Sequence, residues 1–127
     1  MSKVVLDASA VLALLNGEPG HEAVAEAIPE AVLNAVNLSE VVAKLGEKGM
    51  PEEAIATAMA GLEIQIIPFD EASAYETARL RAPSKSLGLS LGDRACLALG
   101  RQLSLPVLTA DKSWSKSDIG LEVRVMR

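Results

Sequence analysis

Four carboxylic acids stand where strand and helix patterns meet in this chain: Asp7, Glu40, Asp93 and Asp111. Carboxylates brought together repel and raise one another's pKa unless a cation neutralises them. An all-oxygen set without His or Cys suits a hard divalent ion, Mg²⁺ or Mn²⁺. Such ions activate water for attack on phosphorus. The residue types therefore indicate metal-assisted hydrolysis if the four side chains converge.

The four acids are expected at one edge of a parallel sheet. Residues 3–6 form a short apolar run, which predicts a strand buried on both faces. Asp7 ends this run and Asp111 ends another, so both lie at the carboxyl ends of strands, where open α/β sheets bind ligands. A crossover helix runs antiparallel to the strands. Glu40 and Asp93, each in the first turn of a predicted helix, are therefore expected over the same edge.

Strand and helix patterns alternate along the whole chain. Strands are predicted at residues 3–6, 31–36, 64–68, 106–109 and 122–125, and helices at residues 11–15, 21–28, 38–45, 51–62, 71–81 and 90–103. Residues 82–89 have little periodicity and are interpreted as a loop. The alternation indicates βαβ units with parallel pairing. We therefore interpret residues 1–127 as one α/β domain with a parallel sheet of about five strands.

Composition and charge narrow the function classes. A net charge of −5 argues against general coating of nucleic acid, but not against an enzyme that places cations between its carboxylates and phosphate. No apolar run reaches the roughly 18 residues of a membrane span, and no signal-peptide pattern opens the chain. The single Cys96 agrees with a reducing cytoplasm. The single His21, in a polar helix start, leaves no ordinary Ser-His or Cys-His nucleophile pair.

Each acid taken alone also has a simpler structural explanation. Asn37 and Glu40, like Ser90 and Asp93, have the spacing of a capping box, in which the third helical residue reaches back to the cap. Asp111 could begin a turn. The metal hypothesis therefore rests on the conjunction of the four acids and not on any one of them.

Asp7 and Asp70 both follow a predicted strand and form a useful contrast. Asp70 is followed by Glu71, Ala72 and Ser73, which makes it an ordinary N-cap. A structural role is harder to assign to Asp7, because the chain continues without a turn and the one structural role left for it is that of an N-cap. We leave Asp70 out of the candidate site.

Polar and basic side chains near the expected edge are candidates for substrate contacts. Arg79, Arg81 and Lys85 flank the 82–89 loop and could bind a phosphate backbone, although solvated helix faces explain most such residues. The Ser9 hydroxyl could bind a metal water or a phosphate, and it could equally bond to the helix backbone.

Four segments resemble the ordered acidic motifs of PIN domains: residues 5–10 (VLDASA), 38–41 (LSEV), 89–93 (LSLGD) and 108–114 (LTADKSW). The chain length and the stretch LLNGEPG at residues 14–20 are similar to those of small VapC-type toxins. No single motif is specific, but the four in this order and spacing are.

The resemblance implies a three-layer fold with a sheet of order 3-2-1-4-5 and helices on both faces. It implies dependence on Mg²⁺, with Mn²⁺ as a substitute. Asp7, Glu40 and Asp93 match the three core acids of the family, and Asp111 matches the fourth and most variable one. Gly92 replaces the Ala or Pro expected before the third acid.

The resemblance also implies a cytoplasmic endoribonuclease that forms homodimers and is inhibited by a VapB-type antitoxin. Cleavage of RNA would leave a 5′-phosphate and a 3′-hydroxyl. One alternative is a non-catalytic PIN-like module that binds RNA or protein. Another is a small phosphotransfer domain, although the haloacid-dehalogenase pattern requires a second Asp where Ser9 stands.

Overall fold

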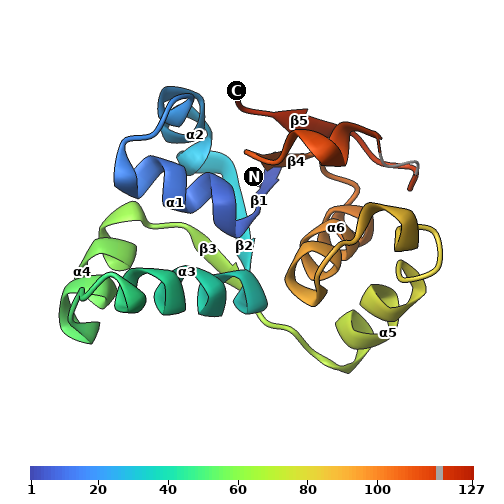
Figure 1. Ribbon diagram of the computed structural model, residues 1–127, viewed down its shortest axis with the longest axis horizontal. Coiled ribbons are helices and arrows are strands. Elements are labelled where there is room, and N and C mark those ends of the chain that lie inside the picture. The colour runs from blue at the N-terminus through green and yellow to red at the C-terminus, as the bar shows by residue number, and fades with distance from the viewer. Residues whose placement is uncertain (117–118) are drawn as a thin grey trace.

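The computed structural model describes residues 1–116 and 119–127 and is built on one parallel sheet (Figure 1). Its strands are β1 (Val4–Leu6), β2 (Ala31–Asn34), β3 (Gln65–Ile67), β4 (Val107–Thr109) and β5 (Val123–Val125). The spatial order is β3-β2-β1-β4-β5, and every neighbouring pair is parallel. The order expected from the family resemblance is therefore confirmed.

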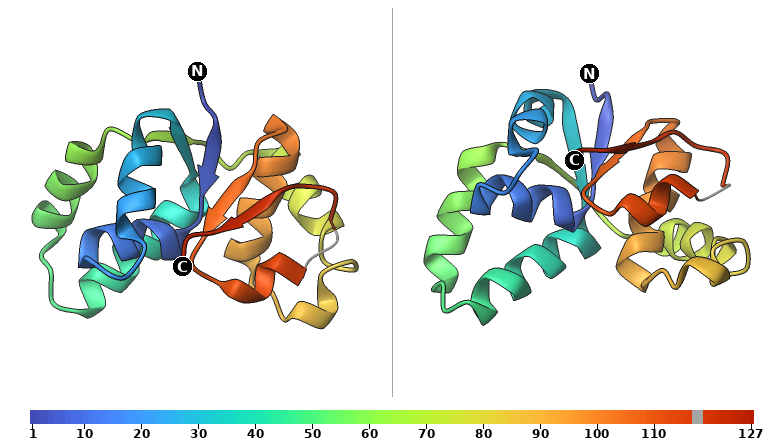
Figure 2. Two further views of the ribbon diagram at one scale, coloured as in Figure 1. Left: turned by 90° about the horizontal axis from the view of Figure 1, so that it is seen from above. Right: turned by 45° about the horizontal axis from the view of Figure 1, so that its top comes forward.

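Helices cover both faces of the sheet, as Figures 1 and 2 show. One face carries α1 (Ala8–Asn16), α2 (His21–Ala27), α3 (Ala35–Glu47) and α4 (Glu52–Leu62), and the other carries α5 (Glu71–Arg79) and α6 (Leu91–Leu103). Short 3₁₀ turns occupy Ile28–Glu30, Lys85–Leu87 and Lys112–Lys116. None of the described helices is long and apolar enough to cross a membrane.

The central strand β1 is buried on both faces because its side chains alternate between two cores. Val4 and Leu6 pack in the core under α1 to α4, and Val5 packs with α6 in the other. Both cores are mainly aliphatic, and the second one also encloses Trp114, which is 1% exposed. This double burial explains the unbroken apolar run in the sequence.

The second strand ends earlier than the sequence pattern predicts. The prediction placed it at residues 31–36, but β2 ends at Asn34 and α3 begins at Ala35. The Asn34 side chain accepts a hydrogen bond from the Val36 amide at 2.8 Å and caps the helix. The prediction was wrong because the β-branched Val36 favours a strand. Its backbone amide is instead bonded to the side chain of Asn34, which starts the helix.

The chain reverses direction across the sheet between β1 and β4. From β1 it proceeds outward to β2 and β3, and it then returns through α5 and α6 to β4 on the other side of β1. Leu6 is in register with Leu108, and the Asp7 amide donates to the Leu108 carbonyl at 3.3 Å. The carboxyl ends of β1 and β4 therefore flank a topological switch point, where ligand crevices form.

Gly100 allows α6 to pack closely against the sheet and against Leu121. A Cβ at this position would lie 2.8 Å from Val107 Cγ2 and 2.9 Å from Leu121 Cδ1. We expect Gly100→Ala to lower the free energy of unfolding by about 1–3 kcal/mol, because the core has no room for a methyl group. Urea denaturation measures the change.

Gly46→Ala is the matched control for this substitution. Gly46 also lies in a helix, but a Cβ there meets nothing within 4 Å. Its replacement should raise the free energy of unfolding by roughly 0.5–1 kcal/mol through helix propensity alone. Equal effects of the two substitutions would contradict the packing assigned to Gly100.

Candidate active site

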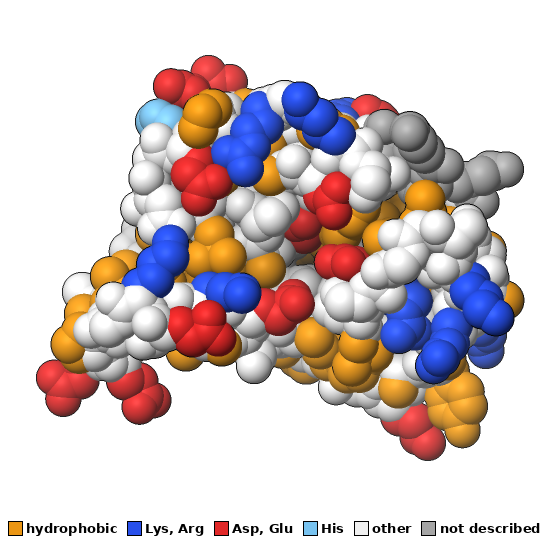
Figure 3. Space-filling view, in the orientation of Figure 1, with side chains coloured by type: hydrophobic (Ala, Val, Ile, Leu, Met, Phe, Trp, Pro, Cys, Tyr) orange, Lys and Arg blue, Asp and Glu red, His pale blue; other side chains and the backbone are white. Residues whose placement is uncertain are grey.

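All four acids identified in the sequence line one cavity. This acid cavity, of about 210 Å³, is lined by Asp7, Ala8, Ser9, Leu12, Asn37, Glu40, Lys44, Asp93, Asp111 and Trp114. Figure 3 shows acidic side chains gathered around a hollow in the middle of one face, between α1, α3 and α6. The hollow lies at the carboxyl ends of β1 and β4, as the alternation of strands and helices predicted.

Asp7 is the most buried of these acids, with 4% of its surface exposed. Its carboxylate accepts hydrogen bonds from the Ala10 amide at 2.8 Å and the Thr109 hydroxyl at 2.6 Å. The Ser9 hydroxyl lies 2.8 and 2.9 Å from its two oxygens. Burial nevertheless raises the pKa of Asp7 to about 6, because these donors compensate only partly for the lost water.

Two hydroxyls fix the Asp7 carboxylate to the end of β4. The Ser9 hydroxyl accepts from the Ala110 amide at 3.0 Å, and the Thr109 hydroxyl accepts from the Asp111 amide at 3.0 Å. Sequence reasoning considered Ser9 as a substrate contact and missed Thr109. Its position at the end of a strand, two residues before a candidate acid, was the signal that could have identified it.

Asp70 shows that burial determines the pKa shift of Asp7. Both residues cap a helix after a strand and accept the amide three residues later, from Ala10 at 2.8 Å and from Ser73 at 2.9 Å. Hydrogen bonds from Ser73 lower the pKa of the exposed Asp70, whereas burial raises that of Asp7. The same local motif therefore gives opposite shifts in the two surroundings.

Glu40 reaches the cavity from the second turn of α3, not from the first turn as predicted, because α3 begins at Ala35. It forms no capping box, since the cap residue is Asn34. Its carboxylate instead accepts from the Asn37 side-chain amide at 2.8 Å. The same amide group donates to the Gly92 carbonyl at 3.0 Å and so links α3 to α6.

Gly92 provides the space that the Glu40 carboxylate occupies. A Cβ at position 92 would overlap both carboxylate oxygens of Glu40. Ala or Pro, which the resemblance led us to expect here, would require the flexible end of the Glu40 side chain to move. Sequence reasoning identified the substitution but not its partner, because the contact joins two helices that are far apart in the chain.

Asp93 and Asp111 line the cavity while they also make local hydrogen bonds. Asp93 forms a capping box with Ser90, with bonds of 2.9 and 3.1 Å. Asp111 accepts from the Ser113 amide at 2.9 Å and from its hydroxyl at 2.7 Å. Asp93 therefore caps a helix and Asp111 stabilises a turn, as their sequence spacing suggested, and both side chains still line the cavity.

The charge of the cavity favours a cation. Among the described residues, no Lys or Arg forms an ion pair with Asp7, Glu40 or Asp93. Lys44 lines the cavity, but its ammonium group lies 3.8 Å from a Glu47 carboxylate oxygen. The charge of Asp93 further raises the pKa of Asp7. Hard divalent cations fit this oxygen-only donor set.

The carboxylates are not yet arranged as ligands around one point. Within the described part of the chain, no three acidic, His or Cys side chains form a group that could hold a metal ion directly. Glu40 and Asp93 are each held through one carboxylate oxygen, by the Asn37 side-chain amide and by the Ser90 backbone amide respectively. Asp7 is the acid already fixed from several sides.

The basic residues chosen from the sequence lie in different surroundings. Arg79 pairs with Glu76 on the same face of α5. Arg81 and Lys85 line a separate cavity near the start of α6. Arg94, from the first turn of α6, lines the same cavity.

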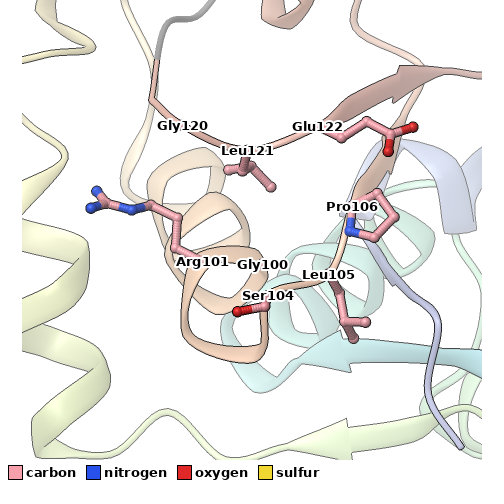
Figure 4. A pocket seen from close by; sticks show the side chains of 8 residues that line it. All are labelled: Gly100, Arg101, Ser104, Leu105, Pro106, Gly120, Leu121 and Glu122. Atoms are coloured by element: carbon pink, nitrogen blue, oxygen red, sulfur yellow. The ribbon is translucent and has the colours of Figure 1, made fainter.

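A larger cavity, of about 350 Å³, lies at the opposite, amino edge of the sheet (Figure 4). It lies between the end of α6 and the residues that precede β4 and β5. Among the described residues, the one acid in its lining is Glu122, which accepts a hydrogen bond from Arg124 at 2.6 Å. Without a set of carboxylates at the switch point, this cavity is a poorer candidate for catalysis.

The model of the PIN domain family matches residues 4–119 of the chain. This chain belongs to the PIN domain family. PIN domains are generally nucleases that use divalent metal ions. Membership of this family removes the support for a phosphotransfer domain. None of the curated proteins matches the sequence.

Solved structures share the fold of this PIN domain over almost its whole length. DNA-bound VapBC from Salmonella typhimurium has a TM-score of 0.78 at 16% identity and covers 100% of both chains. A toxin–antitoxin complex from Klebsiella pneumoniae has a TM-score of 0.76 at 21% identity and 98% coverage of each chain. FitAcB from Neisseria gonorrhoeae has a TM-score of 0.70 at 24% identity and 97% coverage of each.

Removal of the Asp7 charge should stabilise the cation-free protein at neutral pH. The folded-state pKa of about 6 lies above the ordinary aspartate pKa of 3.8, so folding becomes less favourable as the pH rises through this range. At about 1.4 kcal/mol per pKa unit, the cost reaches roughly 3 kcal/mol above pH 6. Asp7→Asn should therefore gain stability over the unsubstituted protein as the pH rises from about 4.5 to 8 in EDTA.

Asp70→Asn is the matched control, because Asp70 is an exposed N-cap whose pKa is lowered. The Asp70 charge stabilises the fold at pH values above the ordinary pKa of an aspartate, and this stabilisation is lost as the pH falls. Asp70→Asn should therefore lose stability relative to the unsubstituted protein as the pH rises, which is the opposite of Asp7→Asn. Urea denaturation across the pH range measures both. If Asp7→Asn gains no free energy of unfolding relative to the unsubstituted protein between acid and neutral pH, burial does not raise the pKa of Asp7.

Proposed function

We propose that this PIN domain is a metal-dependent endoribonuclease and the toxin of a VapBC-type toxin–antitoxin pair. The observation that supports this most is the convergence of Asp7, Glu40, Asp93 and Asp111 on one cavity at the switch point of the sheet. The strands and helices that carry these acids come from both halves of the chain, and the fold brings them together at one edge.

In this proposal Asp7, Asp93 and Glu40 hold a Mg²⁺ ion, directly or through water, and Asp111 completes that site or helps to hold a second ion. The bound cation supplies charge neutralisation at the phosphate and a more acidic water, and Mn²⁺ can replace Mg²⁺. Asp7 is the anchor of the site, because its hydrogen bonds with Thr109, Ser9 and Ala10 orient its carboxylate before any ligand arrives.

The remaining residues of the cavity orient the acids and shape the site. Asn37 holds the Glu40 carboxylate at the first turn of α6, close to Asp93. The buried Trp114 and the half-buried Leu12 form an apolar part of the cavity wall.

The reaction is hydrolysis of a phosphodiester bond of RNA. Water attacks phosphorus in line, the bond from phosphorus to the 3′-oxygen breaks, and the products carry a 5′-phosphate and a 3′-hydroxyl. A covalent enzyme intermediate is not part of the proposal. The Cys96 thiol is buried, with a pKa that burial raises, and His21 does not line the acid cavity.

The proposed function also implies two protein partners, an antitoxin and a second copy of this chain. The solved structures that share the fold include toxin–antitoxin complexes, which supports a VapB-type antitoxin as the inhibitor of this chain. A basic antitoxin side chain placed near the four acids would satisfy the same negative charge as the metal ion. We further propose a homodimer that acts on RNA in the cytoplasm.

A non-catalytic PIN module that binds RNA or protein is the second candidate function. One observation favours it: Glu40, Asp93 and Asp111 each already have a local hydrogen-bond partner, so the acids have a structural role without a metal. The two functions make opposite predictions for metal-dependent cleavage.

The decisive experiment is cleavage of a pool of single-stranded and structured RNA by the partner-free protein. We expect cleavage with Mg²⁺ or Mn²⁺, none with EDTA, and 5′-phosphate ends on the products. Asp7→Asn should reduce the rate at least about 100-fold, the effect typical of losing one group that stabilises transition-state charge. Asp70→Asn, which changes an equivalent helix cap outside the cavity, should retain the rate.

Three results would contradict the nuclease proposal. Cleavage that persists in EDTA would contradict metal dependence, and equal cleavage by Asp7→Asn and the unsubstituted protein would contradict catalysis in the acid cavity. RNA binding without cleavage by a protein that binds Mn²⁺ would favour the non-catalytic module.

A further inference from the structure

A second cavity, of about 250 Å³, lies between the segment that follows α5 and the start of α6. Three cationic side chains line this basic cavity: Arg81, Lys85 and Arg94. Figure 3 shows Lys and Arg side chains gathered on the side of the molecule where α5 and α6 lie. Within the part of the chain that the structure describes, no carboxylate side chain lines this cavity.

These three cations differ from most others in the protein. Arg79, Arg124, Arg127, Lys3 and Lys44 each pair with a glutamate. Within the described residues, none of the three side chains of the basic cavity forms an ion pair with an acid. The chain has 17 acidic and 12 basic side chains, so acids outnumber bases. Three unpaired cations around one hollow therefore favour an anionic ligand from outside the chain.

The walls of the basic cavity are held in place by the fold. Ser84 is buried and its hydroxyl donates to the Leu80 carbonyl at the end of α5. Gly88 has a φ of 64°, in the left-handed region, and turns the chain back toward Ser90. Ser90 then caps α6 through a capping box with Asp93, which fixes the start of the helix. The cavity therefore exists before a ligand arrives.

The first turn of α6 joins the basic cavity to the acid cavity. Ser90 and Arg94 line the basic cavity, whereas Gly92 and Asp93 of the same turn contact or line the acid cavity. An RNA strand that crosses this turn can therefore place one phosphate among the acids and a neighbouring phosphate among the cations. The exposed Leu91, on the rim between them, offers an apolar surface for a ribose or base.

We propose that the basic cavity binds a phosphodiester group of the RNA strand beside the scissile bond. This inference rests on the proposed function and specifies how the substrate is held. The cations provide strand affinity that the acid cavity, with its negative charge, cannot supply by itself. They also explain how a protein with a net charge of −5 can bind a polyanion without a generally basic surface.

The test is binding of a short, fluorescently labelled single-stranded RNA in EDTA, measured by anisotropy over a range of salt concentrations. The double variant Arg81→Gln/Lys85→Gln removes two cations of the cavity. Each lost phosphate contact should reduce the slope of log K against log salt by about 0.7 and weaken binding about fivefold near 0.1 M salt. Thermal melting confirms that the variant remains folded.

Lys48→Gln/Arg101→Gln is the matched control, because it removes the same net charge from exposed positions outside the basic cavity. It should leave the slope and the affinity unchanged. Equal losses in the two double variants would overturn the proposal in favour of a general charge effect. Unchanged RNA binding in the cavity variant would also overturn it.

An acidic peptide, poly-glutamate, tests the other class of ligand. Binding of this peptide with higher affinity than RNA, and its loss only in the cavity variant, would overturn the RNA assignment and identify a protein-binding site. The measurement needs neither metal nor cleavage, so it remains informative if the nuclease assay fails. Conversely, metal-dependent cleavage with an unchanged salt slope would reject the basic cavity alone.

Discussion

The burial of one ionisable carboxylate, Asp7, at the end of the central strand is the constraint on which the site depends. Two hydroxyls and one amide donate to it, yet its pKa is still raised to about 6. No ion pair with Lys or Arg offsets its charge in the described part of the chain. The fold therefore maintains a charged group at a cost in stability, which is typical of functional sites. In the proposed function, a bound divalent cation would offset that cost.

The other acids occupy the cavity at little structural cost because each also has a local partner. Asp93 caps α6 with Ser90, Asp111 stabilises the turn after β4, and Glu40 bonds to Asn37. The cation-free protein can therefore keep several carboxylates close together without leaving them unsatisfied. In the proposed function a divalent cation would bind these carboxylates alongside, or in place of, their local hydrogen bonds.

The location of the site could be predicted from the sequence because it follows from chain topology. Asp7 and Asp111 end strands, and Asp93 begins a helix that leads into a strand, so parallel pairing alone places them at one edge. The details depended on contacts between distant segments. The Thr109 hydroxyl on Asp7 and the space that Gly92 leaves for Glu40 each require a partner from a distant segment. The end of β2 is instead set by a local cap, because the Asn34 side chain accepts from the Val36 amide. The sequence also could not show that Arg81, Lys85 and Arg94 line one cavity, because Arg94 belongs to another element.

The role of Asp7 is tested most directly by Mn²⁺ binding, followed by electron paramagnetic resonance of the free ion near pH 7.5. The unsubstituted protein and Asp70→Asn should bind Mn²⁺ equally, and Asp7→Asn should lose this binding. Equal Mn²⁺ affinity in Asp7→Asn and the unsubstituted protein would mean that the cation is bound without the buried carboxylate, and that Asp7 does not hold it.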